Sequence, residues 1–269
     1  MTKRILTGIA LLGLLVFALV TGGWVFNVLF MGSLCMCVFE FFRALKNAGN
    51  RPVEWPVWTC MAVSIPVYVF SDRMYITMLL IGAACVLTCA NVIFRREPKL
   101  SDLLFSCLPL FSVLVPGLCM LTFQQHPDPA MRAYFILNSF GIALMGDTIA
   151  LFGGRRFGKR ALCPAVSPKK TVEGAFFGLL GSVLFGVGTT LAFGFFTNPP
   201  VLWQVAILSL IAGLAGQVGD LFASLVKRHC EIKDFSDVFP GHGGMMDRLD
   251  SVFFSTVVVY VYYIFYIGV

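Results

Sequence analysis

Charged residues are scarce in this sequence. Only 13% of its 269 residues are Asp, Glu, Lys or Arg, whereas 58% are hydrophobic. A soluble domain carries about 25% charged residues, because polar side chains must cover its surface. The shortage of charge therefore excludes an ordinary water-soluble globule. It also excludes a disordered chain, whose composition is the reverse.

The sequence also lacks the patterns of a disulfide framework or a zinc site. Its nine cysteines lie mostly within apolar runs, where they behave as small buried hydrophobes, and no Cys-x-x-Cys pair or Cys/His spacing accompanies them. The strict alternation of a membrane β-barrel is missing as well. We therefore predict an all-α, polytopic integral membrane protein.

Long apolar runs occupy most of the chain. A membrane-spanning helix needs about 20 mostly apolar residues. By this criterion the sequence predicts nine spans, at residues 5–20, 23–39, 56–70, 74–94, 103–123, 134–152, 175–196, 201–224 and 251–269. We divide them into an N-terminal set of about five spans in residues 1–125 and a catalytic set, with its cytoplasmic loops, in residues 126–269.

Basic residues are distributed unevenly among the predicted loops. With the N-terminus in the cytoplasm, all of the 20 lysines and arginines except Arg73 and Arg132 lie on the cytoplasmic side. Cytoplasmic loops of membrane proteins carry such an excess of positive charge. The sequence thus predicts a cytoplasmic N-terminus in a protein of the cell (inner) membrane, with its polar segments facing the cytoplasm.

Two acidic residues fall inside predicted spans. Asp147 lies in the sixth span and Asp220 near the cytoplasmic end of the eighth. A charged side chain at the centre of a membrane helix costs about 2.5–3.5 kcal/mol on insertion scales, so such residues are candidates for a functional site. A structural carboxylate paired with a nearby Lys or Arg is the alternative for both.

Most of the remaining polar residues lie between the eighth and ninth spans. Cations and carboxylates alternate there, and glycines flank a histidine. With the acidic residue just before this segment, the candidate catalytic residues are Asp220, Ser224, Lys227, Arg228, Lys233, Asp234, His242, Asp247, Arg248 and Asp250. Carboxylates suit Mg²⁺, which shares its other positions with phosphates and water, while Lys and Arg neutralise phosphate charge. This combination is typical of phosphoryl or nucleotidyl transfer. A basic loop that only contacts anionic lipid headgroups explains the cations but not the carboxylates.

Helical spacing supports the same grouping. Asp220, Ser224 and Lys227 share one face if the eighth span continues that far. Asp247 and Asp250 share a face at the start of the ninth span, where a helix beginning near Asp247 would offer its amides to an anion.

A second basic loop precedes the seventh span. The candidate substrate-binding residues, drawn from this loop and the later one, are Ser167, Lys169, Lys170, Thr171, Lys227, Arg228, Gly243, Gly244 and Arg248. Ser167 or Thr171 is expected to cap the seventh span. Glu40, at the inner end of the second span, is interpreted as an interfacial charge.

The segment from Ser224 to Asp250 resembles the signature of the phosphatidate cytidylyltransferases. Every gap between the matching positions has the expected length. These positions are Ser224, Lys227-Arg228, Lys233-Asp234, Pro240, His242-Gly243-Gly244, Asp247-Arg248 and Asp250. Residues 167–174 and 217–220 also look like blocks of this family, so the resemblance covers about residues 147–250. It departs where the family has Asp-x-Gly-Ala-Tyr and this chain has Asp147-Thr-Ile-Ala-Leu151.

The resemblance implies that the cytidylyl group of CTP is transferred to phosphatidic acid, giving CDP-diacylglycerol and pyrophosphate with the help of Mg²⁺. We expect Asp220 and Asp247 to hold Mg²⁺, with Asp147 as a further candidate ligand, and leave a second cation open. The lipid bilayer is the expected environment, a homodimer is suggested by the resemblance alone, and no nucleic-acid partner is expected.

Two other functions remain open from the sequence. An ion-coupled membrane transporter would place ions on Asp147 and Asp220, but transporters tend to repeat their polar, broken helices in both halves. Here the polar residues are concentrated in the second half. Another membrane enzyme of CDP-alcohol or polyprenol phosphate metabolism would use the same Mg²⁺ chemistry.

Overall fold

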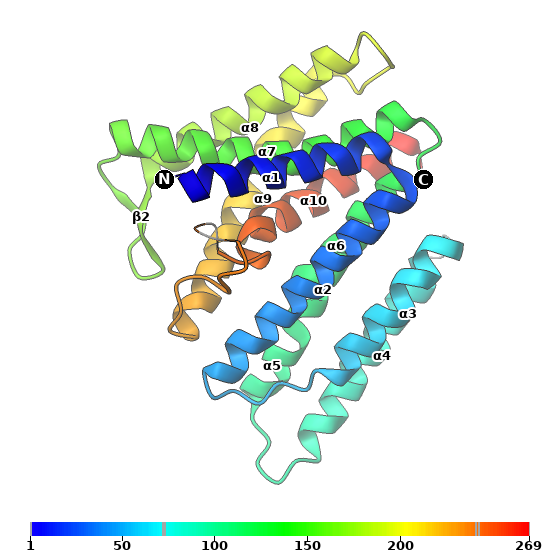
Figure 1. The fold of residues 1–269 in the computed structure, drawn as a ribbon, viewed down its shortest axis with the longest axis vertical. Coiled ribbons are helices and arrows are strands. Elements are labelled where there is room, and N and C mark those ends of the chain that lie inside the picture. Colours follow the sequence, from blue (N-terminus) through cyan, green and yellow to red (C-terminus); the bar gives the residue numbers. More distant parts are fainter. Residues whose placement is uncertain (1, 72–73, 240, 242, 269) are drawn as a thin grey trace.

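The protein is a bundle of long helices (Figure 1). The structure, a computed structural model, describes residues 2–71, 74–239, 241 and 243–268, and 78% of the chain is helical. The α-helices are α1 (Thr2–Thr21), α2 (Gly23–Asn47), α3 (Trp55–Ser71), α4 (Met74–Ile93), α5 (Leu100–Pro109), α6 (Val115–Thr122), α7 (Pro129–Phe157), α8 (Val172–Phe193), α9 (Leu202–His229) and α10 (Met246–Ile267). The predicted all-α class is confirmed.

The helices have the length and composition of a membrane protein. Within the described part of the chain, seven helical segments are long and apolar enough to cross a bilayer. They are Gly23–Asn47, Tyr75–Ile93, Leu100–Gln125, Pro129–Phe157, Val172–Phe193, Leu202–His229 and Met246–Ile267. The two other predicted spans coincide with α1 and with α3, whose apolar part Trp55–Val67 is shorter. The chain is therefore polytopic, while the count of nine crossings stays a prediction.

The fifth predicted span is a broken helix. A π-helical turn, Leu110–Leu114, separates α5 from α6, and a short 3₁₀ turn, Phe123–Gln125, follows. Pro109 and Pro116 flank the π-helical turn and have no amide hydrogen to donate. The resulting gap in the hydrogen-bond ladder lies among buried side chains such as Val113, which shields the freed carbonyl groups from lipid.

Helices α7 to α10 pack against one another and carry the predicted site residues. α7 and α8 run side by side, whereas α3 and α4 pair at the edge of the molecule (Figure 1). Small residues let α7 and α8 approach closely: a Cβ added to Gly153 would lie 2.5 Å from the Cβ of Phe177, and one added to Gly178 would lie 3.0 Å from the carbonyl oxygen of Gly146. Close contact between glycine-bearing faces is a common way to pack helices in a membrane.

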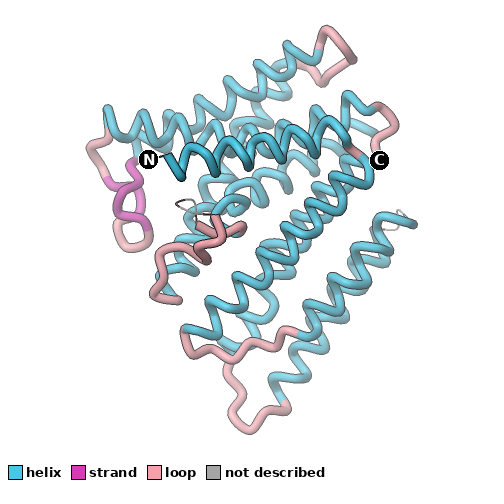
Figure 2. Tube along the Cα trace, in the orientation of Figure 1, coloured by secondary structure: helices cyan, strands magenta, loops and turns pink. Residues whose placement is uncertain are grey.

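A small antiparallel hairpin interrupts the helices between α7 and α8 (Figure 2). It consists of β1 (Ala161–Cys163) and β2 (Ser167–Thr171), which the sequence did not predict because strands this short carry no alternating pattern. Thr171 caps α8 as predicted, since its hydroxyl accepts the Gly174 amide hydrogen at 3.1 Å. Ser167 begins β2 instead of capping the helix.

Candidate active site

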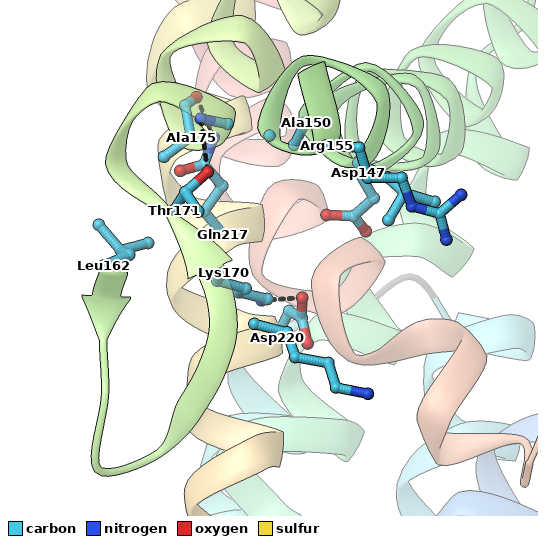
Figure 3. Close-up of a pocket in the computed structure, with 13 residues that line it drawn as sticks. Asp147, Ala150, Arg155, Leu162, Lys170, Thr171, Ala175, Gln217 and Asp220 are labelled. Carbon is cyan, nitrogen blue, oxygen red and sulfur yellow. Dashed lines mark hydrogen bonds and ion pairs between the residues drawn. The ribbon is translucent and has the colours of Figure 1, made fainter. Parts of the chain in front are cut away.

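A polar cavity of about 500 Å³ lies between the hairpin, α7, α8 and α9 (Figure 3). Apolar residues form much of its wall, and the polar residues come from the hairpin, α7 and α9. The polar residues that line it are Asp147, Arg155, Lys169, Lys170, Thr171, Gln217 and Asp220. Four of the predicted substrate-binding or catalytic residues therefore meet here with Asp147, although the sequence separates them widely.

An ion pair crosses the cavity from the hairpin to α9. The Lys170 ammonium reaches from β2 and contacts the Asp220 carboxylate, as Figure 3 shows. Asp147 points into the same space from α7, and its Oδ2 accepts a hydrogen bond from the Ser251 hydroxyl of α10 at 2.9 Å. Carboxylates from α7 and α9 thus face one lysine of the hairpin. The hydrogen bond from Ser251 also connects α10 to this group.

Asp250 of α10 adds a third carboxylate near those of Asp147 and Asp220. Its side chain is buried, and its Oδ1 accepts the Ser251 amide hydrogen at 2.7 Å. The carboxylates of Asp147, Asp220 and Asp250 lie within electrostatic range of one another. Negative charges that are shielded from water repel one another unless cations compensate them. Here Lys170 and Arg248 interact electrostatically with Asp147, and Lys227 interacts with Asp250.

The donor set is compatible with an Mg²⁺ ion that would take only part of its ligands from the protein. Within the described residues there is no cluster of three or more His, Cys, Asp or Glu side chains arranged to hold a metal on its own. Mg²⁺, however, usually binds one or two carboxylates and takes its other ligands from phosphates and water. Asp147 and Asp220 both line the cavity, so they are the residues placed to supply those carboxylates.

Asp247, a predicted metal ligand, is occupied by protein contacts. Its Oδ1 accepts from the Lys227 ammonium at 2.6 Å, and its Oδ2 accepts the amide hydrogens of Phe235 at 2.8 Å and Gly244 at 3.0 Å. The side chain is buried and is not among the described residues that line the cavity. Asp247 therefore organises the loop between α9 and α10 in this structure, and its role as a metal ligand stays a prediction.

Glu40 is the largest difference between sequence and structure. The interpretation as an interfacial charge is wrong, because the side chain is only 1% exposed. Its carboxylate accepts from the Ser236 hydroxyl at 2.5 Å and from the amides of Met245 at 3.1 Å and Met246 at 2.9 Å. A carboxylate is favourable at the N-terminus of a helix, where amide groups lack partners. The amides that were expected to bind a substrate anion are thus taken by Glu40.

The two glycines after His242 allow the loop before α10 to pack closely against Glu40 and Asp247. Gly243 has φ of 78°, a conformation that favours glycine. A Cβ on Gly244 would lie 2.4 Å from Oε2 of Glu40, so a larger residue there would displace the Glu40 carboxylate from its hydrogen bonds. Both glycines permit the close approach of the loop to Glu40 and Asp247, while their contact with substrate stays a prediction.

The other predicted residues are divided between the helix and the loop. Ser224 is buried, and the Arg228 guanidinium donates to the Val166 carbonyl oxygen at 3.2 Å, which ties α9 to the tip of the hairpin. Lys233 and Asp234 are exposed on the loop, away from the residues that line the cavity. Pro240 and His242 lie outside the described residues.

The sequence analysis did not single out Arg155 and Gln217 as site residues. Both line the cavity, and the Gln217 amide donates to the Ala175 carbonyl oxygen at 2.9 Å. The sequence gives no reason to separate Arg155 from the many other basic residues at the ends of spans. Gln217 could have been found, because it is a polar residue within an apolar span, one turn before Asp220.

The comparisons with known proteins agree with this geometry. The family described as "Cytidylyltransferase family" matches residues 2–266. The chain belongs to the cytidylyltransferase family. Among its relatives, phosphatidate cytidylyltransferase 5, chloroplastic, of Arabidopsis thaliana is 30% identical over 96% of this chain and 70% of its own length. The phosphatidate cytidylyltransferase of Staphylococcus epidermidis is 30% identical over 84% of this chain and 89% of its own. That of Staphylococcus aureus is 33% identical over 65% and 64%.

Proposed function

We propose that this cytidylyltransferase transfers the cytidylyl group of CTP to phosphatidic acid, giving CDP-diacylglycerol and pyrophosphate. The observation that carries the proposal is the polar cavity, in which Asp147 of α7 and Asp220 of α9 face Lys170 of the hairpin. Relatives named phosphatidate cytidylyltransferase that match most of the chain support it.

The reaction needs positioning and charge neutralisation more than a strong base. An oxygen of the lipid phosphate attacks the α-phosphorus of CTP, and the bond from that phosphorus to the oxygen bridging to the β-phosphate breaks, so pyrophosphate leaves. The nucleophile is already an anion. Lys169, Lys170 and Arg155 line the cavity, and in this proposal they bind phosphate oxygens, which reduces the repulsion between the two polyanions.

The same residues account for a requirement for Mg²⁺. In this proposal Asp147 and Asp220 hold the ion, with Asp247 and a second cation as further possibilities to be tested. When bound, Mg²⁺ supplies Lewis-acid stabilisation of the charge on the phosphates. Lys170 contacts Asp220, and in this proposal the contact orients the carboxylate toward the cavity before substrate binds.

The membrane topology is part of the proposal. All nine predicted spans cross the bilayer, the N-terminus is cytoplasmic, and residues 126–269 form the catalytic part beside the five spans of residues 1–125. The cavity then opens on the cytoplasmic face of the cell membrane, where CTP is available. A homodimer is compatible with this arrangement and is testable by the mass of the purified protein.

A product assay on the purified protein in detergent tests this function. Phosphatidic acid and Mg²⁺ are supplied with each of the four ribonucleoside triphosphates in turn. We expect CDP-diacylglycerol and pyrophosphate with CTP, and no liponucleotide when the metal is removed by a chelator. Folded protein that makes no liponucleotide under any of these conditions contradicts the proposal.

A further inference from the structure

A second cavity, of about 300 Å³, lies between α1, α2, α7 and the start of α10. Its wall is almost wholly apolar. The lining residues are Gly8, Leu14, Leu15, Ala18, Phe26, Leu29, Phe30, Ser33, Phe140, Leu144, Met245, Arg248 and Leu249. Among these described residues Arg248 alone carries a charge. We call this cavity the apolar groove.

One face of α7 connects the apolar groove with the polar cavity. Phe140 and Leu144 line the groove, whereas Asp147 and Leu151 line the polar cavity. Their spacing of four, three and four residues places all four on the same side of the helix. The two cavities therefore follow each other along a single stripe of α7.

Arg248 stands at the junction of the two cavities. It lines the apolar groove, its side chain is exposed, and its charge acts on the Asp147 carboxylate, which lines the polar cavity. The neighbouring Asp247 and Asp250 side chains are buried on the other sides of α10. A guanidinium in this position can hold a phosphate with two parallel hydrogen bonds at the border between an apolar and a polar space.

The groove is open to its surroundings and has the length of a lipid chain. Leu14 is 46% exposed and Leu144 is 41% exposed, so the groove has an open side along α1 and α7. From Gly8 to Ala18, α1 extends about 15 Å at about 1.5 Å per residue, close to half of a hydrocarbon core that is about 30 Å thick. The stacked rings of Phe26 and Phe30, with Phe140 edge-on to Phe30, form part of the wall.

We propose that the apolar groove binds an acyl chain of the phosphatidic acid substrate and that Arg248 holds its phosphate at the entrance to the polar cavity. Burial of each methylene in the groove is favourable, and the single cation complements the anionic headgroup. This inference rests on the proposed function and extends it by identifying the surface that binds the lipid substrate. It assigns Arg248 to the lipid phosphate, whereas the sequence analysis grouped it with the other substrate-binding cations.

A photoreactive lipid tests the groove without requiring turnover. A phosphatidic acid with a diazirine in the middle of one acyl chain is bound to the purified protein without CTP, irradiated, and the labelled peptides are identified by mass spectrometry. We expect label on α1, α2 and α7 that unlabelled phosphatidic acid displaces and diacylglycerol, which lacks the phosphate, does not. Label confined to helices outside the groove overturns the proposal.

Steady-state kinetics with a matched pair of variants provide a second test. Leu144→Trp fills the groove, and we expect the KM for long-chain phosphatidic acid to rise about tenfold or more, as for an overpacked apolar site, while the KM for CTP stays within about twofold. Leu184→Trp, on the exposed face of α8 outside the groove, should behave as wild type. Equal kinetics for the two variants contradict the proposal.

A substitution of the junction residue separates the two substrates. Arg248→Gln should raise the KM for phosphatidic acid much more than the KM for CTP and weaken photolabelling of the groove. An increase confined to the KM for CTP would indicate that Arg248 binds the triphosphate and would overturn its assignment to the lipid phosphate. Photolabelling of the groove in a protein that makes no CDP-diacylglycerol would refute the proposed reaction and leave the lipid site standing.

Discussion

The ion pair between Lys170 and Asp220 joins the hairpin to α9 at the centre of the polar cavity. In an enzyme that brings two polyanions together, a lysine held by a carboxylate is already positioned for phosphate oxygens. In the proposed reaction, movement of the lysine to a phosphate would leave the carboxylate available to a cation. The pair therefore links the binding of substrate to the charge distribution of the site.

Asp220→Asn should remove this charge without changing the shape of the side chain. We expect kcat/KM to fall by about a hundredfold or more, because each tenfold step corresponds to about 1.4 kcal/mol of lost transition-state stabilisation. Glu97→Gln, on an exposed loop away from the cavity, is the matched control and should leave the rate unchanged. An Asn variant with normal kcat/KM would remove Asp220 from the site.

Glu40→Gln tests whether the loop before α10 depends on its buried carboxylate. The amide of Gln offers one acceptor oxygen where the carboxylate offers two, so it cannot serve Ser236 and both helix amides. We expect the free energy of unfolding to fall by about 1–3 kcal/mol, seen as a lower Tm, together with lower activity. Glu54→Gln, which breaks only the more exposed pair with Lys46, should change the Tm little. Equal Tm values for the two variants would contradict the role of Glu40.

At the scale of elements, the close packing of α7 against α8 fixes the floor of the cavity. Gly178 faces α7 and the Gln217 amide of α9 at 3.0 Å from where its Cβ would be, whereas a Cβ on Gly188 of the same helix meets nothing within 4 Å. Gly178→Ala should therefore overpack the interface and lower stability by about 1–3 kcal/mol. Gly188→Ala should leave the Tm unchanged or raise it slightly. Thermal unfolding of both variants in detergent measures the difference, and equal effects would contradict this packing.

The elements show where sequence reasoning works and where it fails. Apolar length located every long helix, because a span must be long and apolar whatever it packs against. It did not find the hairpin, whose strands are short and whose tip is tied to α9 by the hydrogen bond from Arg228 to Val166, residues that lie far apart in the sequence. The cap at Thr171 was predictable because capping depends on local chemistry alone.

In the candidate site, too, sequence reasoning predicted some residues correctly and misjudged others. Lys169, Lys170 and Asp220 were predicted and line one cavity. Glu40 was misjudged because its partners lie in the last part of the chain, and nothing in the sequence near Glu40 reports them. The expectation that the start of α10 binds an anion was correct in its physics, but the anion is a side chain of the protein.

At the scale of the whole molecule, the proposed topology places the hairpin in the cytoplasm. Cys163 lies in β1 and is partly exposed, whereas burial raises the pKa of the Cys230 thiol and slows its reaction. In intact bacterial cells, a membrane-impermeant maleimide should leave Cys163 unlabelled, and disruption of the membrane should expose it. Asn198→Cys, between α8 and α9, is the control and should react in intact cells. The reverse labelling would contradict a cytoplasmic N-terminus with nine spans.

The most direct test of the account follows the phosphorus atoms of CTP in the purified protein. CTP labelled at its α-phosphorus and CTP labelled at its γ-phosphorus are each incubated with phosphatidic acid and Mg²⁺, and the lipid and aqueous products are counted separately. We predict that the α label enters the lipid as CDP-diacylglycerol, that the γ label appears only in pyrophosphate, and that Asp220→Asn slows the appearance of both products by about a hundredfold or more. A γ label in the lipid, or no label in the lipid from either nucleotide, would contradict the account.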